Sequence, residues 1–299
     1  MNLLITGAWQ QAKEYICEIE RQGHTVAFLQ FEQENLPCDY EWVEGVVCNG
    51  LFLYHDIEKF TNLKYIQIIS AGYDRVPMDY VRTHGIKINN ARGVYSVPMA
   101  EYVLGNVLYL YRQAAAFAGS QKLHQWQKRT GLLELFEKNV CIVGCGSIGT
   151  ECAKRFEAFG CHVTGVATKA RMEEHYEKIV GIEDLGEALA NTDIVVLALP
   201  LMESTKGLMN AEMFAKMKQG AILVNVARGP IVDEEALIGA LEEKLGGAVL
   251  DVFTEEPLKE NSPLWDMDHV IVTPHNSFVG EGNGKRLADV IMKGLKTIE

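Results

Sequence analysis

A buried strand that runs directly into a glycine-rich loop constrains the fold of this chain more than any other feature. The apolar run 139–143 leads into this loop, and a helical pattern follows it. In such a setting the first glycine allows a tight turn, the second lets the backbone approach a pyrophosphate, and the third permits close helix packing. A plain glycine turn is the alternative. We predict that the loop binds a dinucleotide through Gly144, Gly146, Ser147, Ile148 and Gly149.

Short apolar strands alternate with helical stretches along the chain, and this rhythm indicates parallel sheets. A first set of strands is predicted at Asn2–Thr6, Thr25–Leu29, Gly45–Asn49 and Tyr65–Ser70. A second set is predicted at Asn139–Val143, His162–Val166, Asp193–Leu197, Ala221–Asn225, Ala248–Asp251 and His269–Thr273. Apolar spacing also predicts one long helix at 97–118, between the two sets, and a final helix at 284–299 that returns to the first sheet.

Composition narrows the class of partner. The 299 residues, 48% of them hydrophobic, can bury the cores of two domains. The net charge of −12 disfavours nucleic acid and anionic membranes, so an anionic substrate must be held by a few local cations. The seven cysteines contain no CxxC pair, so we expect no metal site, and they are interpreted as small core residues. Cys145 in the glycine loop is the one candidate for a reactive thiol.

The N-terminus lacks the pattern of a signal peptide, and no apolar run reaches the length of roughly 18 residues that a membrane span needs. We therefore expect a cytoplasmic protein that does not interact with membranes.

The loop after the second strand of the dinucleotide unit bears on the choice of cofactor. NAD-preferring proteins carry an acidic residue there, and this chain has Ala167 instead. Thr168, Lys169 and Arg171 follow, and the two cations could accept a 2′-phosphate. The loop favours NADP, with NAD possible. The alternative is that both cations are ordinary solvated charges.

Three polar side chains follow predicted strand ends in the second set. Arg228 comes just after the strand 221–225, Glu256 lies beyond the strand 248–251, and His275 follows the strand 269–273. Parallel strands bring their carboxyl ends to one edge, where open α/β sheets bind ligands. A guanidinium there can bind a carboxylate through two hydrogen bonds. Each residue alone could be structural, but their convergence on one edge favours a site.

An ordered series of motifs makes the chain resemble the D-isomer-specific 2-hydroxyacid dehydrogenase family over essentially its whole length. The series comprises the glycine loop, Leu199-Pro200-Leu201 with Thr205 and Gly207, Asn225-Val226-Ala227-Arg228-Gly229, Asp251-Val252-Phe253 through Glu256-Pro257-Leu258, and Thr273-Pro274-His275.

The resemblance implies two doubly wound parallel-sheet α/β domains. A Rossmann-type cofactor domain, residues 95–276, would be inserted into a flavodoxin-like substrate domain made of residues 1–94 and 277–299. It implies that the substrate lies between the domains, and that the protein is a homodimer, which the helix at 97–118 would suit.

The resemblance also implies roles for individual residues. Arg228 would bind the substrate, Glu256 would be the carboxylate partner, and His275 the acid–base residue. Backbone amides of Ala71 and Gly72 would receive the substrate carboxylate, although a structural turn is the alternative. Further cofactor contacts would come from Leu199, Pro200, Thr205, Val226, Ala227 and Asp251.

The activity implied is hydride transfer between NAD(P)H and C2 of a small 2-oxo or D-2-hydroxy acid, as in a glyoxylate or hydroxypyruvate reductase. A corepressor-like protein of the same fold, which senses the dinucleotide without turnover, is the alternative from another class. A formate dehydrogenase is disfavoured because that branch carries Gln in place of Glu256.

The segment between Arg228 and Glu256 is about one residue shorter than is usual in the family, so Glu255 is a second candidate for the carboxylate partner. Asn276-Ser277-Phe278 departs from the small residues common in the family and points to a different substrate preference.

Overall fold

The computed structural model describes residues 1–297 and divides into two compact units. The first unit consists of Met1–Tyr95 and of the chain from Gly280 onward, and the second is Ser96–Val279. The second unit is thus one continuous segment that interrupts the sequence of the first. Within the described residues, no helix is long and apolar enough to cross a membrane.

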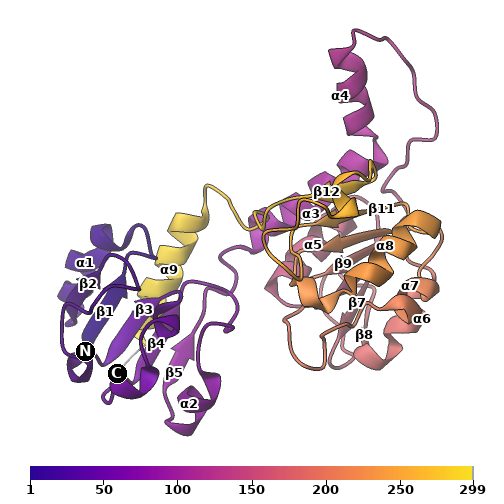
Figure 1. The fold of residues 1–299 in the computed structure, drawn as a ribbon. Coiled ribbons are helices and arrows are strands. Elements are labelled where there is room, and N and C mark those ends of the chain that lie inside the picture. The colour runs from indigo at the N-terminus through magenta and orange to yellow at the C-terminus, as the bar shows by residue number, and fades with distance from the viewer. Residues whose placement is uncertain (298–299) are drawn as a thin grey trace. The chain divides into compact units, whose positions relative to one another are not determined.

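The first unit holds a parallel sheet of five described strands in the order β2-β1-β3-β4-β5 (Figure 1). This is the flavodoxin-like order, in which the direction of winding reverses between β1 and β3. Its strands are β1 (Asn2–Thr6), β2 (Thr25–Leu29), β3 (Gly45–Cys48), β4 (Tyr65–Ile68) and β5 (Lys87–Asn89). Its helices are α1 (Ala12–Arg21), α2 (Met78–Thr83) and α9 (Asn283–Lys296), with 3-10 turns at Tyr40–Trp42, Leu51–Leu53 and Ile57–Lys59.

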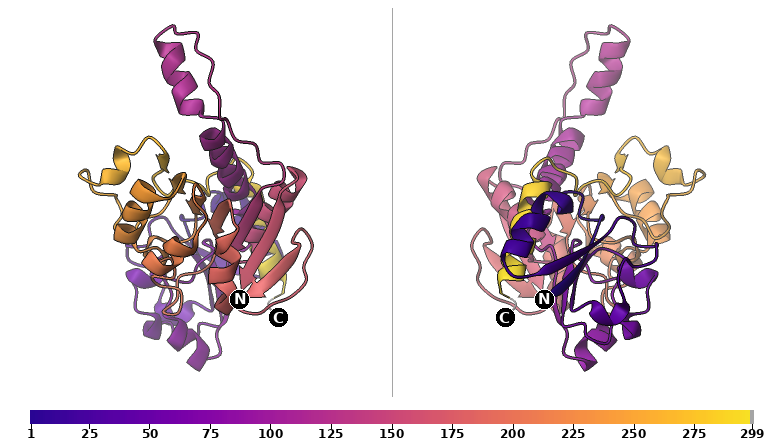
Figure 2. Two further views of the ribbon diagram at one scale, coloured as in Figure 1. Left: turned by 90° about the vertical axis from the view of Figure 1, so that its right-hand side faces the viewer. Right: turned by 90° about the vertical axis from the view of Figure 1, so that its left-hand side faces the viewer.

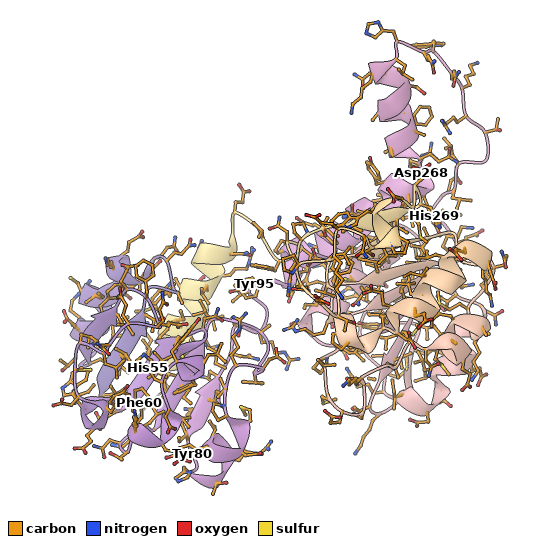
Figure 3. The ribbon with its side chains drawn as sticks, viewed as in Figure 1. His55, Phe60, Tyr80, Tyr95, Asp268 and His269 are labelled. Carbon is orange, nitrogen blue, oxygen red and sulfur yellow. The ribbon has the colours of Figure 1, made fainter. Side chains whose placement is uncertain are left out.

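Apolar side chains cover both faces of this sheet. On one face, Leu287 and Ile291 of α9 share a buried cluster with Leu3 of β1, so the predicted return of the C-terminal helix to the first sheet is confirmed. The other face carries a second cluster, which includes Phe60. Figure 3 labels His55 and Phe60 of this unit, and both side chains are buried.

The second unit holds a parallel sheet of seven described strands in the order β12-β11-β10-β9-β6-β7-β8. This is the Rossmann order with one added edge strand, and the switch point lies between β6 and β9. Its strands are β6 (Asn139–Val143), β7 (His162–Ala167), β8 (Lys178–Gly181), β9 (Ile194–Leu197), β10 (Ile222–Asn225), β11 (Gly247–Leu250) and β12 (Val270–Val272). The predicted fold class is confirmed, but β5 and β8 were absent from the predicted strands.

The described helices of the second unit are α3 (Ser96–Tyr111), α4 (Ala114–Lys122), α5 (Ser147–Ala158), α6 (Leu185–Ala190), α7 (Ala211–Lys216) and α8 (Glu234–Glu243). Short 3-10 turns lie at Ile182–Asp184, Gly229–Ile231 and Pro263–Trp265. Strands such as β9 and β10 are buried along their whole length, as apolar parallel strands covered on both faces should be.

The prediction of one helix at 97–118 is wrong. Gln113 adopts a left-handed backbone conformation (φ 50°, ψ 44°), which ends α3 and starts α4 in a new direction. While α3 packs against α5, α4 projects away from the second sheet in every view (Figures 1 and 2). We call residues 112–134 the arm.

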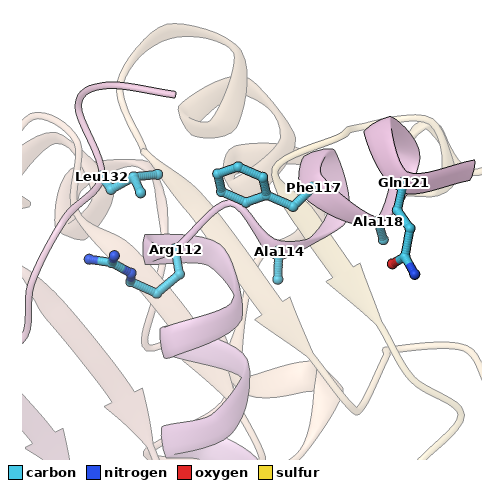
Figure 4. A pocket seen from close by; sticks show the side chains of 6 residues that line it. All are labelled: Arg112, Ala114, Phe117, Ala118, Gln121 and Leu132. Atoms are coloured by element: carbon cyan, nitrogen blue, oxygen red, sulfur yellow. The ribbon is translucent and has the colours of Figure 1, made fainter. Parts of the chain in front are cut away.

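A wide-open surface pocket of about 480 Å³ lies on the arm between α4 and the returning chain (Figure 4). The side chains of Arg112, Phe117, Gln121 and Leu132 line it, together with two alanines. The arm's large apolar side chains are poorly covered, and Trp126 is 97% exposed.

Candidate active site

The glycine loop between β6 and α5 has the geometry that its sequence pattern requires. Gly144 has a φ of +105°, and a Cβ there would lie 2.6 Å from the carbonyl oxygen of Ala198. A Cβ at Gly149 would lie 2.1 Å from the carbonyl oxygen of Gly144. In contrast, a Cβ at Gly146 would meet nothing within 4 Å. The outer glycines therefore serve close packing, and the middle one leaves open space over the loop.

The start of α5 supplies hydrogen-bond donors to that space. Gly146 caps the helix, and its carbonyl oxygen accepts the first helical hydrogen bond from Thr150 N at 2.8 Å. The amides of Ser147, Ile148 and Gly149 precede that bond and have no partner within the helix. A pyrophosphate is the group that such a helix start accommodates. These residues therefore fit a dinucleotide.

Arg171 is tied to the glycine loop from the end of β7. Its Nη2 donates to the carbonyl oxygen of Cys145 at 3.0 Å and lies 2.8 Å from Glu173 Oε2. The other carboxylate oxygen of Glu173 accepts a hydrogen bond from Thr150 Oγ1 at 3.4 Å. Glu173 was not predicted from the sequence, because the acidic residue of NAD-preferring proteins is expected at position 167 and not six residues beyond it. Thr168 and Lys169 are exposed in the same loop.

The loop after β9 is closed by a buried hydroxyl. Thr205 Oγ1 donates to the carbonyl oxygen of Pro200 at 2.8 Å and accepts a hydrogen bond from Met202 N at 2.8 Å. Leu199 and Thr205 are buried, whereas Pro200 is exposed. Of these three predicted cofactor contacts, Pro200 is the one with an exposed side chain.

The loop after β10 presents Arg228. The side-chain oxygen of Asn225 accepts a hydrogen bond from Ala227 N at 3.1 Å, which fixes the turn. Val226 and Ala227 are buried, and the Arg228 side chain, which is partly exposed, donates to the carbonyl oxygen of Ala227 at 2.7 Å.

Gly229 brings this loop against the loop that follows β11. A Cβ at Gly229 would lie 1.9 Å from the carbonyl carbon of Phe253, so no side chain fits there. Phe253 N in turn donates to Glu256 Oε1 at 3.0 Å. Arg228 thus adjoins the loop that carries Glu256.

Glu256 and His275 form a hydrogen-bonded pair. His275 Nδ1 lies 2.9 Å from Glu256 Oε2, and both side chains are about two-fifths exposed. An ionised carboxylate can only accept, so Nδ1 carries the proton and Nε2 is left for another partner. The second candidate, Glu255, forms an exposed ion pair with Lys259 at 2.7 Å. The structure therefore places Glu256, and not Glu255, against the histidine.

His275 stands on a constrained loop. Its φ is +51°, which is uncommon for a residue with a side chain. The fully buried carboxylate of Asp251 accepts hydrogen bonds from Asn276 N at 2.7 Å and Ser277 N at 3.0 Å. It also accepts one from Thr273 Oγ1 at 2.6 Å. The carboxylate of Asp251 is thus directed into the His275 loop.

In the first unit, Ala71 and Gly72 lie in the turn after β4. Their carbonyl oxygens accept hydrogen bonds from Asn90 Nδ2 at 2.6 Å and Ser70 Oγ at 3.0 Å, respectively. Neither of their amides donates to another of the described residues. The turn is therefore fixed through its carbonyls, with both amides available to an acceptor.

Cys145 does not have the setting of a reactive thiol. Its side chain is buried, its sulfur faces the carbonyl oxygen of Val166 at 3.6 Å, and burial raises the pKa of the thiol. Among residues 1–297, no group of three or more His, Cys, Asp and Glu side chains could hold a metal ion.

Comparisons with known proteins agree with this geometry. A family model for the D-isomer specific 2-hydroxyacid dehydrogenase, NAD binding domain, matches residues 104–277. A glyoxylate reductase of Thermofilum pendens is 35% identical over 242 residues, which are 78% of this chain and 71% of that protein. A D-3-phosphoglycerate dehydrogenase of Methanocaldococcus jannaschii is 34% identical over 85% of this chain, but the chain spans only 49% of that longer protein.

A solved structure covers nearly the whole chain. It is the D-isomer specific 2-hydroxyacid dehydrogenase of Xanthobacter autotrophicus Py2 in complex with NADPH and MES. It is 30% identical, covers 99% of this chain and 93% of its own, and has a TM-score of 0.80. Taken with the glycine loop and the His275–Glu256 pair, these matches show that the chain belongs to the D-isomer specific 2-hydroxyacid dehydrogenase family.

Proposed function

We propose that this protein reduces a small 2-oxo acid to the D-2-hydroxy acid, with glyoxylate and hydroxypyruvate as the first candidates. The hydrogen bond between His275 and Glu256 carries the proposal, because it supplies a proton donor beside a stabilising carboxylate. Both residues of the pair lie on loops that follow strands of the second sheet. Strand β6 of the same sheet leads into the glycine loop. Likeness to a glyoxylate reductase supports a small substrate.

In the proposed reaction, His275 as imidazolium gives the Nε2 proton to the C2 oxygen. The reduced nicotinamide, when bound, supplies the hydride that C2 receives, so the carbonyl becomes an alcohol. Glu256 accepts the hydrogen bond from Nδ1–H and so orients the ring. The Arg228 guanidinium binds the carboxylate of the substrate in two-point fashion and fixes the orientation of C2. In the first unit, we assign the amides of Ala71 and Gly72 as further donors to a substrate carboxylate.

A dinucleotide-sensing regulator of the same fold is the second candidate. The specific observation in its favour is that the loop residues that fit a dinucleotide would serve sensing as well as catalysis. Partner capture that depends on the dinucleotide, without turnover of any 2-oxo acid, would distinguish it from an enzyme.

For the cofactor we propose that the protein prefers NADPH to NADH and still accepts NADH. Lys169 and Arg171 supply positive charge after β7, and Arg171 is already oriented by its bond to the carbonyl oxygen of Cys145. Glu173 opposes this preference, because its carboxylate pairs with the guanidinium that a 2′-phosphate would need. Likeness to a dehydrogenase solved with NADPH supports the choice.

We also propose a homodimer in which the arm contacts a second copy. The arm, residues 112–134, carries a net charge of +3, which leaves −15 on the rest of the chain. An electropositive arm with exposed Trp126 and Leu123 is complementary to an acidic partner of this kind. The open pocket on the arm offers apolar surface for the contact.

A substrate panel tests the proposed reaction. We expect NADPH oxidation with glyoxylate, hydroxypyruvate or another small 2-oxo acid. Arg228→Lys should lower kcat/KM by roughly 100-fold, because an ammonium cannot reproduce the planar two-point contact. Absence of turnover across the panel would refute the enzyme, and an Arg228→Lys variant with wild-type kcat/KM would remove Arg228 from the site.

A pair of variants tests the His275–Glu256 contact. Replacing Glu256 by Gln exchanges the carboxylate that accepts the hydrogen bond from His275 Nδ1 for a neutral amide, so kcat/KM for reduction should fall by roughly 10-fold. Glu255→Gln serves as the matched control and should leave kcat/KM unchanged, because Glu255 pairs with Lys259 instead. Equal losses of kcat/KM in the two variants would contradict the assignment.

Kinetics with NADPH and NADH test whether the loop after β7 recognises the 2′-phosphate. We expect the wild type to prefer NADPH by about tenfold, because exposed charge pairs are weakened by solvent. The double variant Lys169→Ala, Arg171→Ala should lose this preference, while Glu173→Gln should increase it by freeing the guanidinium. Equal use of both cofactors by the wild type would show that the loop does not read the phosphate.

Sedimentation velocity tests the dimer. The wild type should sediment as a dimer at micromolar concentration, and Trp126→Asp should shift it toward the monomer because a carboxylate would be desolvated at the contact. Phe31→Asp, at an exposed aromatic outside the arm, is the matched control and should leave the distribution unchanged. A monomeric wild type would refute the proposal.

A further inference from the structure

A chain of hydrogen bonds runs from helix α3 into the loop of His275. The hydroxyl oxygen of Tyr102 lies 2.6 Å from Thr273 Oγ1, and Thr273 Oγ1 donates to Asp251 Oδ1 at 2.6 Å. Because the single Thr273 hydroxyl proton goes to the carboxylate, Tyr102 must be the donor to Thr273. Burial raises the pKa of Tyr102 to about 12, so this donor keeps its proton across the neutral pH range.

Asp251, at the far end of this series of hydrogen bonds, fixes the backbone at His275 and at the two residues after it. The Asp251 carboxylate accepts hydrogen bonds from the amides of Asn276 and Ser277, and the Asp251 carbonyl oxygen accepts one from His275 N at 2.9 Å. A left-handed backbone at a residue with a side chain persists only where the surroundings hold it. Here the hydrogen bonds to Asp251 provide that restraint.

The hydrogen bond from Thr273 Oγ1 decides how well the Asp251 carboxylate can restrain the His275 loop. Asp251 is fully buried, so its carboxylate must find its hydrogen-bond donors inside the protein. Without the Thr273 hydroxyl, Oδ1 would lose one of its two donors and the carboxylate could rotate away from the amides. The hydroxyl of Tyr102 would then also lose its acceptor.

We propose that Tyr102 and Thr273 are positioning residues for His275, acting through the buried carboxylate of Asp251. They hold the imidazole so that Nδ1 meets Glu256 and Nε2 faces the reacting oxygen. This inference rests on the acid–base role proposed for His275. It adds a helix residue, distant in the sequence, to the machinery of that proton transfer.

Thr273→Val and Thr273→Ser form the decisive pair of variants. Valine keeps the shape and removes the hydroxyl, whereas serine keeps the hydroxyl. With the best 2-oxo acid of the panel, Thr273→Val should lower kcat by roughly 10- to 100-fold, as a small misplacement of a catalytic group does. Its Kd for ADP-ribose, which binds away from the proton transfer, should stay within about twofold of the wild type, because the glycine loop is untouched. Thr273→Ser should restore most of kcat.

Tyr102→Phe tests the outer end of the chain. The loss of one hydrogen bond should lower kcat by about 3- to 10-fold. Tyr109→Phe, at an exposed tyrosine of the same helix, is the matched control and should leave kcat unchanged. Wild-type kcat in Thr273→Val, failure of serine to restore it, or a parallel loss of ADP-ribose binding would overturn the proposal.

Nitrogen-15 NMR of His275 separates this proposal from the proposed function. In the wild type at high pH the neutral ring should carry its proton on Nδ1, and Thr273→Val should show a mixture of both tautomers. A Thr273→Val spectrum identical to the wild type would overturn the positioning role whether or not the enzyme turns over. If His275→Asn kept full kcat, the acid–base function itself would fail.

Discussion

Close backbone contacts that only glycine permits determine the carboxyl edge of the second sheet. A Cβ at Gly144 would overlap the chain after β9, and one at Gly229 would overlap the chain after β11. These contacts draw the loops after β6, β9, β10 and β11 together at one edge. Because the overlapping atoms belong to backbone, no side-chain rearrangement could relieve them. Everything proposed for the site depends on this edge being so compact.

Two carboxylates at this edge lie in different environments, and these environments suit different roles. Asp251 is completely buried and satisfied by three donors, so its charge is offset by hydrogen bonds that also shape the His275 loop. Glu256 is about two-fifths exposed and holds one amide and the imidazole. A buried, fully bonded carboxylate suits a structural role. A partly exposed one beside a histidine can respond to the change of charge that proton transfer brings.

The sequence predicted those parts of the molecule whose signals are local. The strand, glycine loop and helix at 139–158 follow one another without interruption, and strand ends located Arg228, Glu256 and His275. The missed strand β5 has only three residues, too few to show a pattern. The break at Gln113 has no local signal either, because neither Gly nor Pro marks it and glutamine is a good helix former. Tyr102 was missed because its partner Thr273 lies 171 residues away.

Charge poses the remaining physical problem for the proposed function, in which an acidic protein has to attract an anionic dinucleotide and an anionic 2-oxo acid. Long-range attraction is unfavourable at a net charge of −12, so binding must rely on donors that act at contact distance. In the proposed function, amides at the start of α5 and in the turn at 71–72 would meet this need without adding mobile charge. Arg171 would meet it with an oriented guanidinium, although Glu173 takes up part of that capacity. The proposed cofactor preference is therefore a competition between a carboxylate of the chain and the 2′-phosphate of the ligand for the same cation.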